Sequence, residues 1–122
     1  MDHRQLARTL AALRTVIGVA LLVAPATAGG AWLGGAKPDR RARLLLRGLG
    51  ARDLALGLGT LRALDQGTPV RPWVAMSVIG DVADAVGATA ALRSLGPARA
   101  AITVAAAGGG AALGAVAVSD LD

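Results

Sequence analysis

The sequence predicts an all-α integral membrane protein, an up-down-up-down bundle of four transmembrane helices. Two observations favour this fold. Long apolar stretches alternate with short polar connections, and the hydrophobic fraction is 54% although aromatic residues make up only 2%. Small residues such as Ala and Gly let helix backbones approach closely in lipid, where association depends on packing rather than on expelling water. A soluble Ala/Leu-rich helical bundle is the competing interpretation. At 122 residues, we expect one domain covering residues 1–122.

Composition also narrows the possible functions. The net charge of +5 does not indicate nucleic-acid binding, because the basic residues stand at the ends of apolar runs and only two Trp are available to stack on bases. The chain has no Cys, so it has no thiolate nucleophile, and its one histidine, His3, lies at the terminus. We expect no cofactor. The Ala, Arg and Gly bias is typical of a bacterial coding background, so we predict a multi-pass protein of the bacterial cytoplasmic membrane.

The first predicted span covers about residues 10–34. No charged residue occurs from Thr15 to Ala36, which is the length of about 20 residues that a helix needs to cross a bilayer. Pro25 lies inside this run, so we expect the helix to end or kink there. Trp32 would then lie at the membrane interface. A cleaved signal peptide, with its cleavage site among the small residues 24–28, is the alternative interpretation.

Three further spans follow, with short connections between them. We place these spans at about residues 42–64, 73–95 and 98–118. The connections contain basic residues at 37–43, Gly and two Pro at 65–72, and Gly-Pro at 96–97. Basic residues flank the first and third connections most heavily, so these connections are expected in the cytoplasm and both termini outside.

The second and third spans carry charged residues where a membrane helix usually has none. The third span has a stripe of small and polar residues on one face, comprising Ser77, Gly80, Asp81, Asp84, Gly87, Ala88 and Ala91. The second span contains Arg47, Arg52 and Asp53. A charged side chain at mid-bilayer costs at least about 2.5–3.5 kcal/mol, so such residues pair with one another. We therefore expect Arg52, with Arg47 or Arg14 as alternatives, to meet the three aspartates Asp53, Asp81 and Asp84.

This cluster has two interpretations. Buried Arg–Asp pairs can serve only to lock the helices in register. Alternatively, Asp81 and Asp84 are adjacent carboxyls on one helix face and act as catalytic proton donors. The candidate binding residues are Arg47, Arg52, Asp53 and Ser77. We predict no metal site, because the Asp81 and Asp84 pair has no Glu or His to complete a ligand set.

Glycines predict where the helices pack closely. In the second span, Gly50, Asp53 and Gly57 share one face, and Gly48, Arg52 and Gly59 share nearly the opposite one. The pairs Gly30/Gly34 and Gly110/Gly114 have GxxxG spacing, which is typical of close helix–helix contacts.

The pattern Arg47-Gly-x-Gly50-x-Arg52-Asp53-x-x-Leu56-Gly57, followed by Trp73 and Asp81-x-x-Asp84, resembles a family of small four-helix bacterial and fungal membrane proteins whose function is not assigned. The resemblance covers most of the chain and implies four spans but no activity. A more distant similarity is to membrane-embedded isomerases and terpene cyclases. Those enzymes typically have Glu or aromatic residues in their pockets, and this chain departs from that pattern.

Three functions follow as hypotheses. The first is a membrane protein that binds or gates an apolar or amphiphilic small molecule, or a partner helix, at the Arg/Asp cluster. The second is a membrane-embedded acid–base enzyme acting on a lipid-like substrate, with Arg52 stabilising negative charge. The third is a subunit of a proton-coupled transporter. The expected partners are the lipid bilayer, an apolar small molecule and further copies of the chain.

Overall fold

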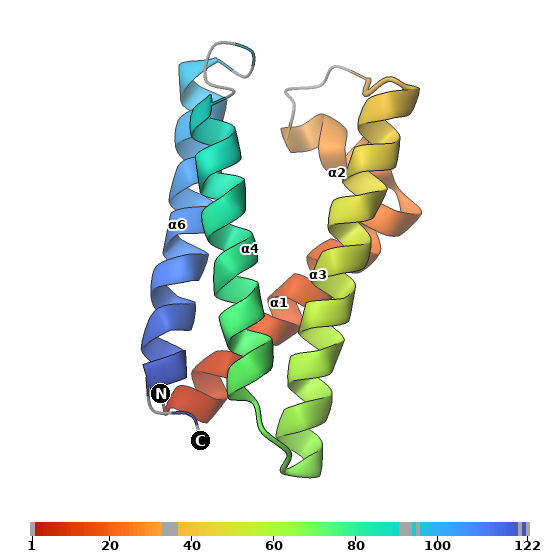
Figure 1. Cartoon of the computed structure of the whole chain (residues 1–122). Helices are drawn as coiled ribbons and strands as arrows, with labels where there is room; N and C mark the ends of the chain where they lie inside the picture. Colours follow the sequence, from red (N-terminus) through yellow and green to blue (C-terminus); the bar gives the residue numbers. More distant parts are fainter. Residues whose placement is uncertain (1, 33–36, 91–93, 95, 120, 122) are drawn as a thin grey trace.

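The computed structural model describes residues 2–32, 37–90, 94, 96–119 and 121. These residues form α-helices joined by short turns, with no strand among them, which confirms the all-α prediction. The helices are α1 (His3–Val23), α2 (Pro25–Trp32), α3 (Arg40–Gln66), α4 (Arg71–Ala90) and α6 (Pro97–Ser119) (Figure 1).

The first apolar run divides at its proline. α1 ends at Val23, Ala24 leaves the helical conformation with φ −131° and ψ 60°, and Pro25 opens α2. Proline favours this first helical position because it has no N–H to donate. The prediction of a helix end at Pro25 is therefore confirmed. α1 begins earlier than expected, at His3, because the Asp2 side chain caps it by accepting a 2.7 Å hydrogen bond from the Gln5 backbone N–H.

α3 is the longest helix and has a cap at each end. The Asp39 side chain accepts a 2.8 Å hydrogen bond from the Ala42 backbone N–H. At the other end Gly67 adopts the left-handed conformation, with φ +65°, which glycine reaches without the steric cost of a Cβ. The short turn that follows leads into α4, as predicted. α4 is described as far as Ala90, and the predicted span end near residue 95 lies outside the described residues.

Within the described part of the chain, three helices are long and apolar enough to cross a membrane by length and composition: α1, α4 and α6. By the same measure of length and composition, α3 does not belong to this group. It carries many charged residues, most of them near its ends: Arg40, Arg41, Arg43, Arg47, Arg52, Asp53, Arg62 and Asp65. Hydropathy thus supports the first, third and fourth predicted spans, whereas the second span at 42–64 needs a further argument.

The helices pack as two pairs. α1 lies along α3, α4 lies along α6, and the two pairs diverge towards the upper end of Figure 1. α1 crosses obliquely behind α4 in Figure 1, and it also contacts α6. α1 begins and α6 ends at the lower end of the figure, and the long helices alternate in direction. The arrangement is more open than the bundle that the sequence predicts.

Glycine lies where α1 meets α3, and many large apolar residues lie on the outside of the helices. Where α1 meets α3, a Cβ on Gly18 would stand only 2.8 Å from the Gly50 carbonyl oxygen. Large aliphatic side chains instead cover the outer faces of the helices, among them Val16, Val19, Leu44, Leu58, Ile79, Val86, Ile102 and Val116. Soluble monomers rarely expose so extensive an apolar surface, which is instead suited to contact with lipid.

Candidate functional site

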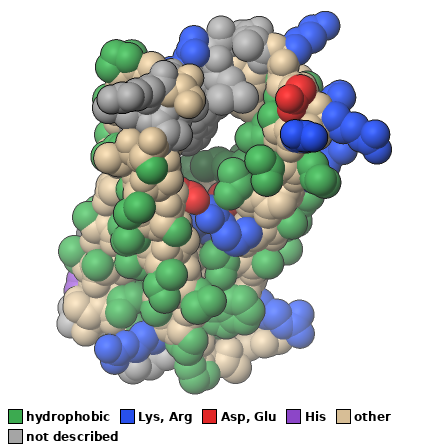
Figure 2. Space-filling model, turned by 45° about the horizontal axis from the view of Figure 1, so that its top comes forward, with side chains coloured by type: hydrophobic (Ala, Val, Ile, Leu, Met, Phe, Trp, Pro, Cys, Tyr) green, Lys and Arg blue, Asp and Glu red, His purple; other side chains and the backbone are tan. Residues whose placement is uncertain are grey.

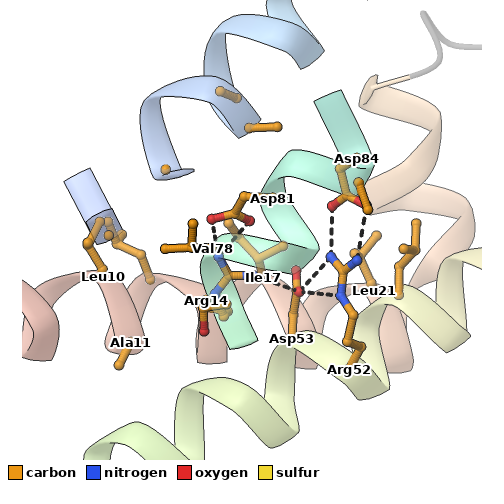
Figure 3. Close-up of a pocket in the computed structure, with 18 of the residues that line it drawn as sticks. Leu10, Ala11, Arg14, Ile17, Leu21, Arg52, Asp53, Val78, Asp81 and Asp84 are labelled. Carbon is orange, nitrogen blue, oxygen red and sulfur yellow. Dashed lines mark hydrogen bonds and ion pairs between the residues drawn. The ribbon is translucent and has the colours of Figure 1, made fainter. Parts of the chain in front are cut away.

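An ion-pair network joins the middles of three helices. Its members are Arg14 from α1, Arg52 and Asp53 from α3, and Asp81 and Asp84 from α4 (Figure 3). Asp53 lies halfway along α3, about 20 Å from either end at 1.5 Å per residue. Asp53 and Asp81 are buried, so the network lies at mid-height and largely away from solvent.

Arg14 connects α1 to the other two helices of the network. Its Nη1 donates a 3.0 Å hydrogen bond to Asp53 Oδ1, and its Nη2 donates to both carboxylate oxygens of Asp81 at 2.6 Å. Only 15% of the Arg14 side chain is exposed. Among the described residues, Asp81 receives side-chain hydrogen bonds from Arg14 alone, so this arginine is its single counter-charge.

Arg52 connects α3 to α4. Its Nη1 and Nη2 donate parallel hydrogen bonds to the two oxygens of Asp84, at 3.0 and 2.7 Å. This bidentate geometry is the strongest arrangement that a guanidinium forms with a carboxylate. Nε and Nη2 of Arg52 also donate to Asp53 Oδ1, at 3.2 and 2.9 Å. Asp53 Oδ1 therefore accepts from both arginines and links the two halves of the network.

Glycines make space for the charged side chains. A Cβ on Gly110 of α6 would lie 2.8 Å from Asp81 Oδ2, so the absence of a side chain there accommodates the carboxylate between α4 and α6. Gly114, one turn further on, faces Val78 in the same way, at 2.7 Å from Cγ2. The prediction of close packing at Gly110 and Gly114 is confirmed. For the pair Gly30/Gly34, residue 34 lies outside the described part of the chain.

A cavity of about 650 Å³ lies beside the network. Figure 2 shows the hollow between the two helix pairs, with acidic and basic side chains at its lower edge. All five residues of the network line it, together with Ser77 and small or aliphatic residues. The apolar lining comes from all the long helices and includes Leu10, Ile17, Leu21, Leu49, Val78, Gly87, Ala106 and Ala107. The cavity is thus an apolar space with one charged wall.

Four of the sequence-predicted site residues meet as expected: Arg52, Asp53, Asp81 and Asp84. Ser77 lines the same cavity, but its hydroxyl donates a 3.0 Å hydrogen bond to the Trp73 carbonyl on its own helix. Arg47 lies apart from the network. It is exposed, and its Nε donates a 3.4 Å hydrogen bond to the Leu22 carbonyl.

Arg14, which the sequence predicts only as an alternative to Arg52, belongs to the network together with Arg52. The uncharged run begins at Thr15, so hydropathy places Arg14 at the end of a span. Because α1 begins at His3, Arg14 instead lies at its middle. Two sequence features point to Arg14. Asp2 is a residue type that favours the N-cap position, and the three aspartates of the expected cluster outnumber Arg52.

The carboxyls of Asp81 and Asp84, which the sequence predicts to be neighbours, bind different arginines in the structure. Asp81 pairs with Arg14 and Asp84 pairs with Arg52, so each of the two carboxyls has its own guanidinium group (Figure 3). For either aspartate to act as a proton donor, its ion pair would first have to open. The geometry therefore favours a preorganised polar surface over a site for acid–base catalysis.

Comparison with known proteins found no match for this chain among protein-family models, curated proteins or solved structures.

Proposed function

We propose that the chain is a bacterial cytoplasmic membrane protein with four membrane-crossing helices, α3 included. The charged residues at the middle of α3, Arg52 and Asp53, are the main obstacle to its insertion. Both are bound to groups of opposite charge on neighbouring helices. Pairing of this kind is how ionisable residues are accommodated inside a membrane, so α3 crosses in company with α1 and α4.

The function that this geometry supports best is the binding of an amphiphilic small molecule between the two helix pairs. The observation that carries the proposal is the apolar cavity of about 650 Å³ with the ion-pair network in its wall. Ligand pockets commonly have volumes of about 300–1,000 Å³ and a mostly apolar lining with a few fixed polar groups. An alkyl chain would occupy the aliphatic part, while a polar headgroup would contact the charged wall.

Filling the cavity should remove this binding. Gly87 lines the cavity, and a Cβ built on it meets no atom within 4 Å, so Leu at this position extends into open space. We expect Gly87→Leu to reduce labelling of cavity residues such as Leu21 about tenfold, equivalent to about 1.4 kcal/mol of binding. The probe is decanol carrying a diazirine, photolysed with protein in phosphatidylcholine vesicles, and labelled positions are mapped by mass spectrometry.

The matched control is Gly109→Leu on α6. A Cβ there also meets nothing within 4 Å, but Gly109 does not line the cavity. Labelling at the lipid-facing Val16 measures how much probe enters the bilayer in each sample. If cavity labelling is no greater than labelling at Val16, or if both leucine variants reduce it equally, the proposed binding site is wrong.

A further inference from the structure

We propose that the ligand is a hydrophobic cation, an alkyl chain with a quaternary or protonated amine. This inference rests on the proposed function and names the class of molecule that the cavity takes. The observation behind it is the charge balance of the cavity wall. The network holds two arginines and three aspartates, so with every group ionised its net charge is −1.

No other charged side chain among the described residues lines the cavity. Arg47, the nearest basic residue of α3 in sequence, donates to the Leu22 carbonyl instead. The ion pair between Arg8 and Asp65 is half exposed and lies outside the cavity lining. An uncompensated negative charge in an apolar environment is costly, and a monovalent cation with an apolar body would bring the wall to neutrality.

The carboxylates also have room to accept such a cation. Asp84 is the most exposed carboxylate of the network, at 34%, against 13% for Asp53 and 11% for Asp81. Among the described residues, all three hydrogen bonds to Asp53 end on Oδ1 and none on Oδ2. Oδ2 is therefore available as an acceptor or as a counter-charge to the ligand.

The cavity lining excludes the other common way of holding a cation. The chain has no Phe or Tyr, and Trp73 does not line the cavity, so the described lining contains no aromatic residue that could form an aromatic cage. The carboxylates would therefore recognise the cationic group by its charge, and aliphatic side chains would contact the alkyl chain of the ligand. An anionic amphiphile would meet three carboxylates in a wall that already has an excess of negative charge.

Three decyl probes test this charge preference: decyltrimethylammonium, decanol and decyl sulfate, each with a diazirine on its chain. Labelling of cavity residues is divided by labelling of lipid-facing Val16, which corrects for the different entry of each probe into phosphatidylcholine vesicles. We expect the ratio to be about tenfold higher for the cation than for decanol, and lowest for decyl sulfate.

Asp84→Asn is the informative variant. It brings the charge of the wall to zero, yet Arg52 keeps Asp53 as its counter-ion, and the amide oxygen can still accept a hydrogen bond from Arg52. We expect this variant to bind the cation and decanol equally. The control is Asp65→Asn, which removes an aspartate of an exposed ion pair outside the cavity and should keep the preference for the cation.

The outcomes separate the two proposals. Suppose that Gly87→Leu abolishes cavity labelling by all three probes, and that in the unsubstituted chain decanol labels the cavity as strongly as the cation does. The cavity then binds amphiphiles, but the charge inference is wrong. If Asp84→Asn retains the tenfold preference, the excess carboxylate is not its origin and the inference also fails. If no probe shows labelling that depends on Gly87, the binding function itself fails. Because the first comparison uses the unsubstituted chain, it holds even if Asp84→Asn does not fold.

Discussion

Replacing Arg14 with Gln is expected to destabilise the protein by about 3–5 kcal/mol, because it leaves buried Asp81 without a counter-charge. Asp53 is less affected, since it keeps its hydrogen bonds from Arg52. The loss of stability arises mainly from the buried Asp81 carboxylate that remains without a counter-charge, and not from the interaction energy of the ion pair itself. The double variant Arg14→Gln with Asp81→Asn should therefore recover a large part of the stability.

The measurement is the free energy of unfolding in mixed micelles, and α1 offers a matched control. Arg8 forms an ion pair with Asp65 at 2.7 Å, but the two side chains are 50% and 63% exposed. Arg8→Gln should therefore cost less than about 1 kcal/mol. Equal losses from Arg8→Gln and Arg14→Gln would contradict the view that the network is buried and depends on Arg14.

Adding a single methyl group at Gly18 is expected to cost about 1–3 kcal/mol, and Gly18→Leu should prevent assembly of α1 with α3. A Cβ at this position would lie 2.5 Å from Leu54 N, 2.8 Å from Gly50 O and 2.9 Å from Leu54 Cα. These are all backbone atoms, so no side-chain rotation relieves the contact and the two helices must separate. Separation would also lengthen the 3.0 Å hydrogen bond between Arg14 and Asp53, one turn away.

The control for this second prediction is Gly48→Ala in the exposed part of α3. A Cβ there meets nothing within 4 Å, so the substitution should have no packing cost. It should increase the free energy of unfolding by up to about 1 kcal/mol, because Ala has a higher helix propensity than Gly. Unfolding measurements on Gly18→Ala and Gly48→Ala in the same micelles compare the two positions directly. A Gly18→Ala protein as stable as the parent would show that the α1–α3 contact is looser than described.

Local rules predict much of the helical framework. The break at Pro25, the cap at Gly67 and the start of α6 at Pro97 follow from the backbone limits of proline and glycine. The stripe of Asp81, Asp84 and small residues on one face of α4 likewise follows from helical periodicity. These features depend on residues close together in sequence, which is why they can be read from the chain alone.

The pairing of charges depends instead on how helices cross. Arg14 reaches both Asp53 and Asp81 because α1 runs obliquely across the molecule, a geometry that no local pattern specifies (Figure 1). Hydropathy counts each charge of α3 separately, so it cannot register that Arg52 and Asp53 are neutralised by partners on other helices. The cavity is also a property of the divergence of the two helix pairs and has no sequence signal of its own.

We propose that α3 crosses the membrane and holds the charged network at mid-depth, and labelling the two ends of α3 tests this proposal. The chain contains no cysteine, so single cysteines at Lys37 and Thr68, both exposed beyond the ends of α3, are unique labelling sites. In intact bacterial cells, a membrane-impermeant maleimide should label Thr68→Cys, whereas Lys37→Cys should react only after the membrane is opened. Labelling of both cysteines from the same side of the membrane would show that α3 does not cross it.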